Sequence, residues 1–332
     1  MVAFETVKQS NSQLPKLAPG LVAVFVGATS GIGLESMRYL ARHTAAPRIY
    51  SVSRAQTAEK HRGVLASLRE ANPAGSYNLV EADFSLLSEV DKIARAVGEK
   101  ETKVDVLYMS AGFLPFEGRF DTAEGLEPSM TTRYYSRQLL LEKLLPLLNS
   151  EDAPSPRVVS VLAGGQEAPL NEDDLDLREK SNWSFWNASV HSATMLTLSL
   201  ERVARENPRL SIVHWFPGPV STPGLTRAGN FGMTLPDPMS AEESGQRGVF
   251  HATSDMYARH GSLVPSVSGE LPGAVAGVAK TTAGGIWLLD PRGEGTDNEK
   301  VLAEMRKDGL PDRVWEFTRG IFASAITTTT ST

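Results

Sequence analysis

The 332-residue sequence contains no cysteine. This absence excludes disulfide bonds, thiolate metal ligands and thiol nucleophiles. Long hydrophobic runs are also missing, since the longest, Leu21–Val26, is far shorter than the roughly 20 residues that a membrane-spanning helix needs. The first twenty residues lack the apolar core of a signal peptide. We therefore expect a cytoplasmic protein without a membrane span.

An excess of positive charge is absent as well. The chain has 33 Lys and Arg against 39 Asp and Glu, a net charge of −6, and no basic block that a nucleic acid would bind. The six histidines lack metal-ligand spacing, so the sequence predicts no metal site. With 41% hydrophobic and 22% charged residues, the chain can bury a full core, and a small molecule is the expected partner.

Strand and helix patterns alternate along most of the chain. Leu21–Val26 is a short apolar run that ends at Gly27, which is typical of a strand buried on both faces of a parallel sheet. Further strands are expected at 48–52, 77–81, 104–109, 157–162, 210–216 and 285–289, and helices at 34–43, 57–71, 86–98, 122–148 and 187–205. The alternation predicts an α/β fold with a doubly wound parallel sheet in a three-layer αβα arrangement.

The same pattern suggests one domain with extensions. We expect an N-terminal extension at 1–20, a domain at 21–326 that includes a C-terminal extension with a closing helix near 300–322, and a flexible tail at 327–332. Two stretches rich in Pro, Gly, Ser and Thr, 217–238 and 261–277, are long for connections. They are candidate lid or substrate loops.

A glycine-rich turn follows the first expected strand and opens a helix. Its sequence is Gly27-Ala-Thr-Ser-Gly-Ile-Gly33. Glycines there let a pyrophosphate approach main-chain N–H groups at the positive end of the helix, as in Rossmann-type folds. A turn that merely packs the helix on the strand is the alternative. The predicted cofactor contacts in this turn are Gly27, Thr29, Ser30, Gly31, Ile32 and Gly33.

The residues about 20 positions after the turn bear on the choice of cofactor. A carboxylate at this place would bind the ribose hydroxyl of NAD, whereas the chain has Ser53 followed by Arg54. A hydroxyl beside a guanidinium accepts a 2′-phosphate, which favours NADP(H). An ordinary solvated arginine at a strand end is the alternative for Arg54.

Together with the turn, three later motifs resemble those of short-chain dehydrogenases/reductases over about residues 20–225. They are Ala82-Asp-Phe-Ser85, Ser110-Ala-Gly112 and Pro217-Gly-Pro-Val-Ser-Thr222, and the later residues resemble the tails of long fungal members. The resemblance implies a Rossmann-type sheet that binds NADP(H). It adds these expected cofactor contacts: Asp83, Phe84, Ala111, Gly112, Pro217, Gly218, Val220 and Thr222.

Members of that family carry an Asn, Ser, Tyr, Lys tetrad, in which the Tyr exchanges a proton with the substrate oxygen. None of the seven tyrosines here is followed by Lys four residues later. Matching the motifs puts Arg133 at the Asn position, Ala163 at the Ser position, Asn187 at the Tyr position and His191 at the Lys position. All four tetrad positions are changed.

The remaining candidates for chemistry come from these replacements. His191 is a possible proton donor and ribose contact, Asn187 an oxyanion donor, and Arg133 an anion-binding group. Tyr135 and its neighbour Tyr134 are alternative proton donors. For each residue the alternative is a packed or surface side chain without a catalytic role.

Three functions follow as hypotheses. The first is an NADP(H)-dependent reductase of a carbonyl or imine in a small secondary-metabolite-type molecule, with a non-standard proton source. The second is a non-redox isomerase or cyclase that reuses the fold, and the third is a noncatalytic NADP-binding protein. The helices at 122–148 and 187–205 also offer faces for pairing between copies of the chain, so a homo-oligomer is a candidate state.

Overall fold

The computed structural model describes residues 2–113, 115–116, 118–264 and 280–329, with side chains up to 324. Its centre is one eight-stranded sheet in the order β3-β2-β1-β4-β5-β6-β7-β8. β1 to β7 are parallel, and β8 pairs with β7 antiparallel. The strands are β1 Val22–Val26, β2 Arg48–Ser53, β3 Ser76–Glu81, β4 Val106–Met109, β5 Arg157–Val161, β6 Ser211–Trp215, β7 Trp287–Leu289 and β8 Gly295–Thr296. The predicted doubly wound sheet is confirmed, and the two-residue β8 is an addition that no sequence pattern announced.

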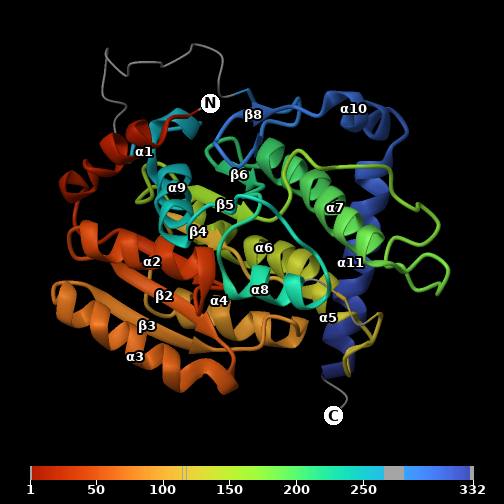
Figure 1. Cartoon of the computed structure of the whole chain (residues 1–332), viewed down its shortest axis with the longest axis horizontal. Helices are drawn as coiled ribbons and strands as arrows, with labels where there is room; N and C mark the ends of the chain where they lie inside the picture. The colour runs from red at the N-terminus through yellow and green to blue at the C-terminus, as the bar shows by residue number, and fades with distance from the viewer. Residues whose placement is uncertain (1, 114, 117, 265–279, 330–332) are drawn as a thin grey trace.

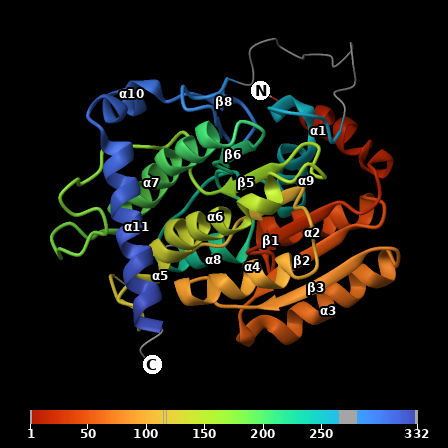
Figure 2. The same cartoon turned by 180° about the vertical axis from the view of Figure 1, so that it is seen from behind.

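Helices cover both faces of the sheet and make three layers (Figures 1 and 2). The helical segments are α1 Phe4–Asn11, η1 Leu14–Lys16, α2 Gly31–His43, α3 Ala55–Ala71, η2 Leu87–Glu89, α4 Val90–Gly98, α5 Pro128–Met130, η3 Thr131–Tyr135, α6 Ser136–Leu148, α7 Phe185–Glu206, α8 Pro223–Asn230, α9 Ala241–Thr253, η4 Asp255–Tyr257, α10 Glu299–Lys307 and α11 Leu310–Thr329. Side chains on the two faces of each strand feed separate cores: Val24 packs with α4, α6 and α7, and Phe25 packs with α2 and α9. This alternation follows from the two-residue period of a strand.

The extensions are structured parts of the domain. The N-terminal extension forms α1, which packs on α9, and Asn11 Nδ2 donates a hydrogen bond to the Gln246 carbonyl at 2.9 Å. The expected lid at 217–238 contains the helix α8, and most of the stretch 261–277 lies outside the described residues. α11 continues to Thr329, so the segment expected to be a flexible tail is helical at its start, and 330–332 lie outside the described residues.

The long helix expected at 122–148 is shorter than predicted and is interrupted. It starts at Pro128, because the Glu127 carboxylate accepts a hydrogen bond from the Met130 N–H at 2.7 Å and proline suits the first helical position. The next five residues, η3, form a π-helical turn before α6 begins. Such turns often occur at functional sites, and this one carries Arg133.

The chain's own α11 covers the helix face that was a candidate for pairing between copies (Figure 2). Tyr134 Oη lies 2.8 Å from Ser199 Oγ on α7 and 2.6 Å from Thr318 Oγ1 on α11. The Arg202 guanidinium on α7 stacks on the Trp315 ring of α11. Pairing through this face would therefore require α11 to leave it.

We predict that Tyr134→Phe lowers the free energy of unfolding by about 1–2 kcal/mol, because it leaves two buried hydroxyls with one partner fewer. The midpoint and slope of urea denaturation measure this change. Tyr39→Phe is the control, since Tyr39 is half-buried and stacks on His43, and it should change stability by less than about 0.5 kcal/mol. An unchanged midpoint for Tyr134→Phe would show that α11 docks without these hydrogen bonds.

Candidate functional site

A cavity of about 660 Å³ lies where the strand order reverses. β1 pairs with β2 on one side and with β4 on the other, so the connections that follow these strands leave in opposite directions. In open α/β sheets, ligands bind at this point, beyond the carboxyl ends of the strands. A cavity of this volume is within the range of small-molecule and cofactor sites.

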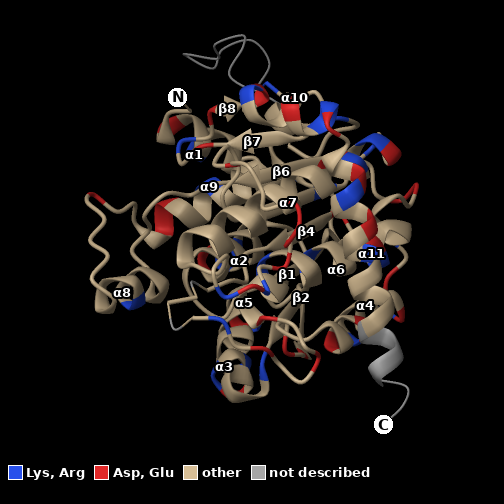
Figure 3. Ribbon diagram, turned by 90° about the vertical axis from the view of Figure 1, so that its right-hand side faces the viewer, with Lys and Arg blue, Asp and Glu red and all other residues tan. Residues whose placement is uncertain are grey.

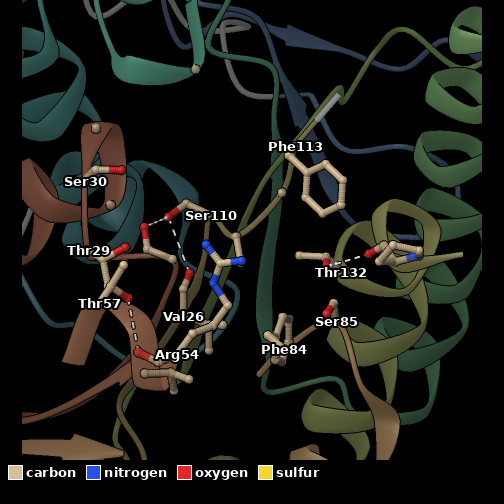
Figure 4. A pocket seen from close by; sticks show the side chains of 18 of the residues that line it. Val26, Thr29, Ser30, Arg54, Thr57, Phe84, Ser85, Ser110, Phe113 and Thr132 are labelled. Carbon is tan, nitrogen blue, oxygen red and sulfur yellow. Dashed lines mark hydrogen bonds between the residues drawn. The ribbon is translucent and has the colours of Figure 1, made fainter. Parts of the chain in front are cut away.

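The glycine turn allows very close packing at the floor of the cavity. Gly27 has φ +93°, and a Cβ built on it would lie 2.6 Å from Ala111 Cα and would also overlap the Ala111 nitrogen. A Cβ on Gly33 would lie 2.6 Å from the Gly27 carbonyl oxygen and would overlap Ser110 Oγ. Ser110 Oγ donates to that same carbonyl at 3.1 Å (Figure 4). These positions accept only glycine, and they bring the main chain of the turn to the cavity surface.

The start of α2 borders the cavity without an internal cap. Ser30 is the N-cap residue, and its side chain makes no cap hydrogen bond. The first N–H groups of a helix need partners from outside the helix, and its positive end favours an anion. Together with the room left by Gly27 and Gly33, this arrangement fits the pyrophosphate of a dinucleotide.

The opposite wall of this region carries the residues expected at the adenosine end. Arg54 is exposed at the N-cap of α3, next to Ser53 and one turn before Thr57. Ser53 Oγ and Thr57 Oγ1 lie 2.9 Å apart. All three line the cavity, and so do Asp83 and Phe84 after β3 (Figure 4). Guanidinium, two hydroxyls and a helix N-terminus together provide several donors for a phosphate group.

Most of the predicted cofactor contacts come together around this cavity. The lining residues include Gly27, Thr29, Ser30, Gly31, Ile32, Gly33, Arg54, Asp83, Phe84, Ala111, Gly112 and Thr222. Four predicted contacts are not among them: His191, Pro217, Gly218 and Val220. Pro217 faces a separate, smaller hollow, Gly218 packs against Pro291, and Val220 is buried beside Met239.

His191 is held within the protein core by two backbone groups. It is 3% exposed, its Nε2 accepts from the Asn171 N–H at 3.0 Å, and its Nδ1 lies 3.3 Å from the Leu175 carbonyl. Burial lowers the pKa of His191, which keeps the ring neutral at pH 7. With both ring nitrogens engaged away from the cavity, His191 has the geometry of a packing residue, contrary to the expected proton donor.

Asn187 and the two tyrosines are also directed away from the cavity. Asn187 is exposed in the first turn of α7, where its Nδ2 donates to the Asn182 carbonyl at 2.7 Å. Tyr135 Oη donates to Asp176 Oδ1 at 2.8 Å, and burial raises the pKa of its phenol well above the usual value. Tyr134 is engaged with α7 and α11, and burial raises its pKa to about 12. The described structure does not bring these groups to the cavity.

Arg133 is the one tetrad replacement that lies beside a cavity-lining residue. A Cβ built on Gly112 would be 3.3 Å from Arg133 Cγ. Its guanidinium is buried, and its hydrogen bonds to described residues are long ones to Ser189, 3.3 Å to Oγ and 3.4 Å to the carbonyl oxygen. Burial lowers the pKa of Arg133 to about 10, so the group stays charged at pH 7.

A second buried arginine, Arg137, follows one turn later and was not among the predicted site residues. Its Nη1 donates to Ser160 Oγ at 2.6 Å and to the Val161 carbonyl at 3.0 Å, and its Nη2 donates to the Ala111 carbonyl. It therefore joins the carboxyl ends of β4 and β5 at the cavity. Desolvation and the charge of Arg133 lower the pKa of Arg137 to about 9. The four-residue spacing from Arg133 was visible in the sequence, but arginine on a helix is usually a surface residue.

A buried hydrogen-bond network lies behind Ala163, which occupies the position of the family's serine. The Ala163 N–H donates to His214 Nε2 at 3.2 Å, and His214 Nδ1 lies 2.8 Å from Thr197 Oγ1. Thr197 in turn donates to the Glu167 carboxylate at 2.7 Å. His214 is fully buried, and burial lowers its pKa to about 3. The chain thus places Ala163, which has no hydroxyl, at the position of the family's serine, with a neutral histidine network behind it.

We predict that stability decreases when the pH is lowered from 7 to 5.5. The pKa values of His214 and His251 are lowered to about 3 by burial, whereas an unfolded histidine titrates near about 6.5. Below that value the unfolded chain binds protons that the folded chain does not, so stability present above about pH 6.5 is lost toward pH 3. Each histidine should remove roughly 1 kcal/mol over this interval.

Urea denaturation at both pH values measures this effect. His214→Gln should reduce the pH-dependent loss by roughly one histidine's share, about 1 kcal/mol, whereas His260→Gln at an exposed position should leave it unchanged. If His214→Gln kept the full pH dependence, a neutral buried His214 would be ruled out.

Within the residues that the structure describes, no helix is long and apolar enough to cross a membrane, and no group of His, Asp and Glu side chains could hold a metal ion. Several solved structures share the fold. A protein described as putative and uncharacterised from Mycobacterium paratuberculosis has a TM-score of 0.58 at 20% identity, covering 93% of this chain and 97% of its own. An NADPH-bound carbonyl reductase from chicken fatty liver has a TM-score of 0.53 at 18% identity, covering 84% and 99%.

Sequence comparison identifies closer relatives. The chain is 58% identical over 98% of its length to an NmrA-like family domain-containing oxidoreductase, notO, of an Aspergillus species, of which it covers 96%. It is 37% identical over 98% of its length to the oxidoreductase AN1596 of Emericella nidulans, of which it covers 99%. The family model described as short chain dehydrogenase matches residues 21–230. This protein therefore belongs to the short-chain dehydrogenase/reductase family.

Proposed function

We propose that the chain is an NADP(H)-dependent reductase of a carbonyl or imine group in a small secondary-metabolite-type molecule. The observation that carries this proposal is the continuous cavity from Arg54 to Gly112. One end offers donors for a 2′-phosphate, the middle offers the uncapped start of α2, and the far end lies beside the buried Arg133. When bound, the nicotinamide would supply the hydride.

The protein's part in the reaction begins with binding and orientation. Gly27 and Gly33 let the main chain contact the pyrophosphate, and Ser53, Arg54 and Thr57 surround the expected phosphate position. Ala111, Gly112 and Val161 form the wall at the carboxyl ends of β4 and β5. These small and apolar side chains leave space for a flat ring at that end of the cavity.

Positive charge at the Gly112 end of the cavity favours a hydride acceptor that becomes more negative during the reaction. Arg133 and Arg137 are both protonated at pH 7, and neither contacts a carboxylate among the described residues. A hydride added to a carbonyl or imine carbon leaves negative charge on oxygen or nitrogen, which a nearby fixed positive charge stabilises. The Arg133 guanidinium, with its long bonds to Ser189, is the more available of the two.

Water is the proposed source of the proton. The described cavity lining contains no His, Lys, Tyr, Cys or Glu, and its ionisable members are Arg54, Asp83 and Arg227. The Thr132 and Ser110 hydroxyls already donate to backbone carbonyls. Since the candidate donors His191 and Tyr135 are engaged elsewhere, a water that reaches the product oxygen or nitrogen completes the reduction.

We predict that Arg54→Asp weakens NADPH binding by roughly tenfold to a hundredfold, because it removes a charge-assisted hydrogen bond and adds a repulsive carboxylate. NADH binding should change by less than about threefold, since NADH lacks the 2′-phosphate. Fluorescence titration with each dinucleotide measures both affinities. Arg95→Asp, at an exposed position of α4 that does not line the cavity, is the matched control.

The outcomes separate cofactor choice from other roles of Arg54. Equal losses for NADPH and NADH would assign Arg54 a structural role and would remove the argument for NADP. No NADPH binding by the unmodified protein would contradict the proposed function itself.

We also predict that Arg133→Met lowers kcat by roughly tenfold to a hundredfold, with little change in NADPH affinity, because it removes a charge that stabilises the reduced group. A panel of ketones and cyclic imines with NADPH identifies the reduced substrate by a gain of two mass units. Arg157→Met is the matched control, since Arg157 is equally buried but lies at the amino end of β5 and bonds to Ser211 and Asp255. His191→Gln and Tyr135→Phe should keep at least about a third of the rate per folded molecule, since general acids typically contribute far more than that.

Three results would contradict this mechanism. A loss of at least about a hundredfold in His191→Gln would restore His191 as the proton donor. A product of unchanged mass would indicate an isomerase or cyclase, and inert NADPH across the whole panel would indicate a noncatalytic binding protein.

A further inference from the structure

Exposed hydrophobic side chains concentrate near the end of the cavity that the loop after β4 lines. Among the described residues, the exposed large hydrophobic side chains are Phe120 at 53%, Trp186 at 69%, Phe231 at 47% and Leu235 at 41%. Phe120 lines the cavity directly, and Leu235 follows Phe231 in the segment after α8. Exposed apolar groups gathered in one place indicate a binding surface, because scattered single residues are the usual pattern.

Ring contacts join three of the surrounding segments. The Phe116 ring stacks on Phe231 with a centroid distance of 4.5 Å and an interplanar angle of 12°, and on Phe185 at 4.9 Å and 8°. Trp186 contacts the edge of Phe185 at 5.1 Å. We call Phe116, Phe185, Trp186 and Phe231 the aromatic wall. It connects the loop after β4, the residue after α8 and the first turn of α7.

The aromatic wall meets the proposed reaction site at Phe116, the one member of the wall among the described lining residues. Phe113, Pro115, Phe116 and Phe120 all line the same cavity as Gly112, and Phe113 lies across the cavity from Arg54 and Thr57 in Figure 4. α8, which supplies Pro223, Gly224 and Arg227 to the lining, projects from the body of the molecule (Figure 3). A ligand on the wall would therefore reach the carboxyl end of β4.

Aromatic and proline side chains dominate the cavity lining beside the aromatic wall. Asp83, at the adenosine end, is the one carboxylate of the described lining, and the Arg227 guanidinium packs over the Phe113 ring at 5.9 Å. Apart from Arg227, Thr122, Thr132 and Thr222, the described lining side chains around the aromatic wall offer mainly aromatic and proline surfaces. Flat apolar surfaces of this kind bind planar ring systems by stacking.

We propose that the aromatic wall binds the substrate, and that this substrate is a planar polycyclic aromatic molecule that carries its reducible carbonyl or imine near one edge. That the ligand is a substrate rests on the proposed function, whereas the existence of the binding site does not depend on that function. The rings stack on the exposed faces and edges of the wall while the reducible group points toward Gly112.

The test compares two probes of similar size, 2-hydroxymethylanthracene and its fully hydrogenated analogue, by isothermal titration calorimetry in the presence of NADPH. The aromatic probe should bind roughly tenfold more tightly, because ring stacking contributes about 1 kcal/mol or more beyond apolar burial. Phe116→Leu should remove most of this preference and leave the NADPH affinity unchanged. Phe317→Leu, a partly buried phenylalanine on α11 that does not line the cavity, should behave as the unmodified protein.

Each outcome decides the question. Equal binding of the two probes, or an unchanged preference in Phe116→Leu, would overturn the inference, and so would an equal loss in Phe317→Leu. Aromatic preference lost only in Phe116→Leu would support it. If the unmodified protein discriminates between the probes but does not bind NADPH, the proposed reductase function fails while the aromatic site stands.

Discussion

The structure depends on how closely two strand ends approach each other at the switch point of the sheet. Gly27 at the end of β1 and Ala111 at the end of β4 leave no room for even one additional carbon atom. This approach holds the turn flat against the neighbouring strand and aims the start of α2 at the cavity. A side chain at Gly27 would face both a positive φ and main-chain overlap, and neither can relax by a change of rotamer. The cavity exists because the backbone, rather than any side chain, forms its floor.

Arg137 completes this arrangement on the other side of β4. Burying a guanidinium without a carboxylate costs several kcal/mol unless its donors are satisfied. Here the donors bind the Ala111 and Val161 carbonyls and the Ser160 hydroxyl, which lie at the carboxyl ends of β4 and β5. The charge therefore joins two strand ends where the parallel ladder stops. Burial lowers the pKa values of both Arg133 and Arg137, and the charge of Arg133 lowers that of Arg137 further.

Sequence patterns were sufficient for the parts of the molecule that local chemistry determines. The sheet was predicted from the alternating strand and helix patterns that begin with the apolar run before Gly27. Most of the cofactor contacts predicted from the glycine spacing, the Ser53-Arg54 pair and the later motifs line the cavity. The patterns failed where partners come from distant segments. His191 has the spacing of a catalytic residue, but its environment is set by Asn171 and Leu175 in an irregular loop. Pro217 and Gly218 match a family motif in sequence, yet the chain after β6 directs them toward Pro291 and the N-terminal residues. Similarly, α1 and α9 lack strong individual signals, and their places in the fold follow from the packing of α9 on both α1 and α2.

The division of the site into a backbone floor and an aromatic outer end has consequences for specificity. A pocket that recognises its ligand by stacking and shape discriminates against a missing methylene by roughly 10–200-fold, and it rejects an added hydroxyl only weakly. The residues that would set such preferences, Phe113, Phe116, Phe120 and Phe231, lie on connections after β4 and α8. Substitutions in these connections leave Gly27, Gly33 and Ala111 untouched, so the shape of the outer end can change without disturbing the turn. Connections on a rigid sheet thus separate the preference for a ring system from the binding of the dinucleotide.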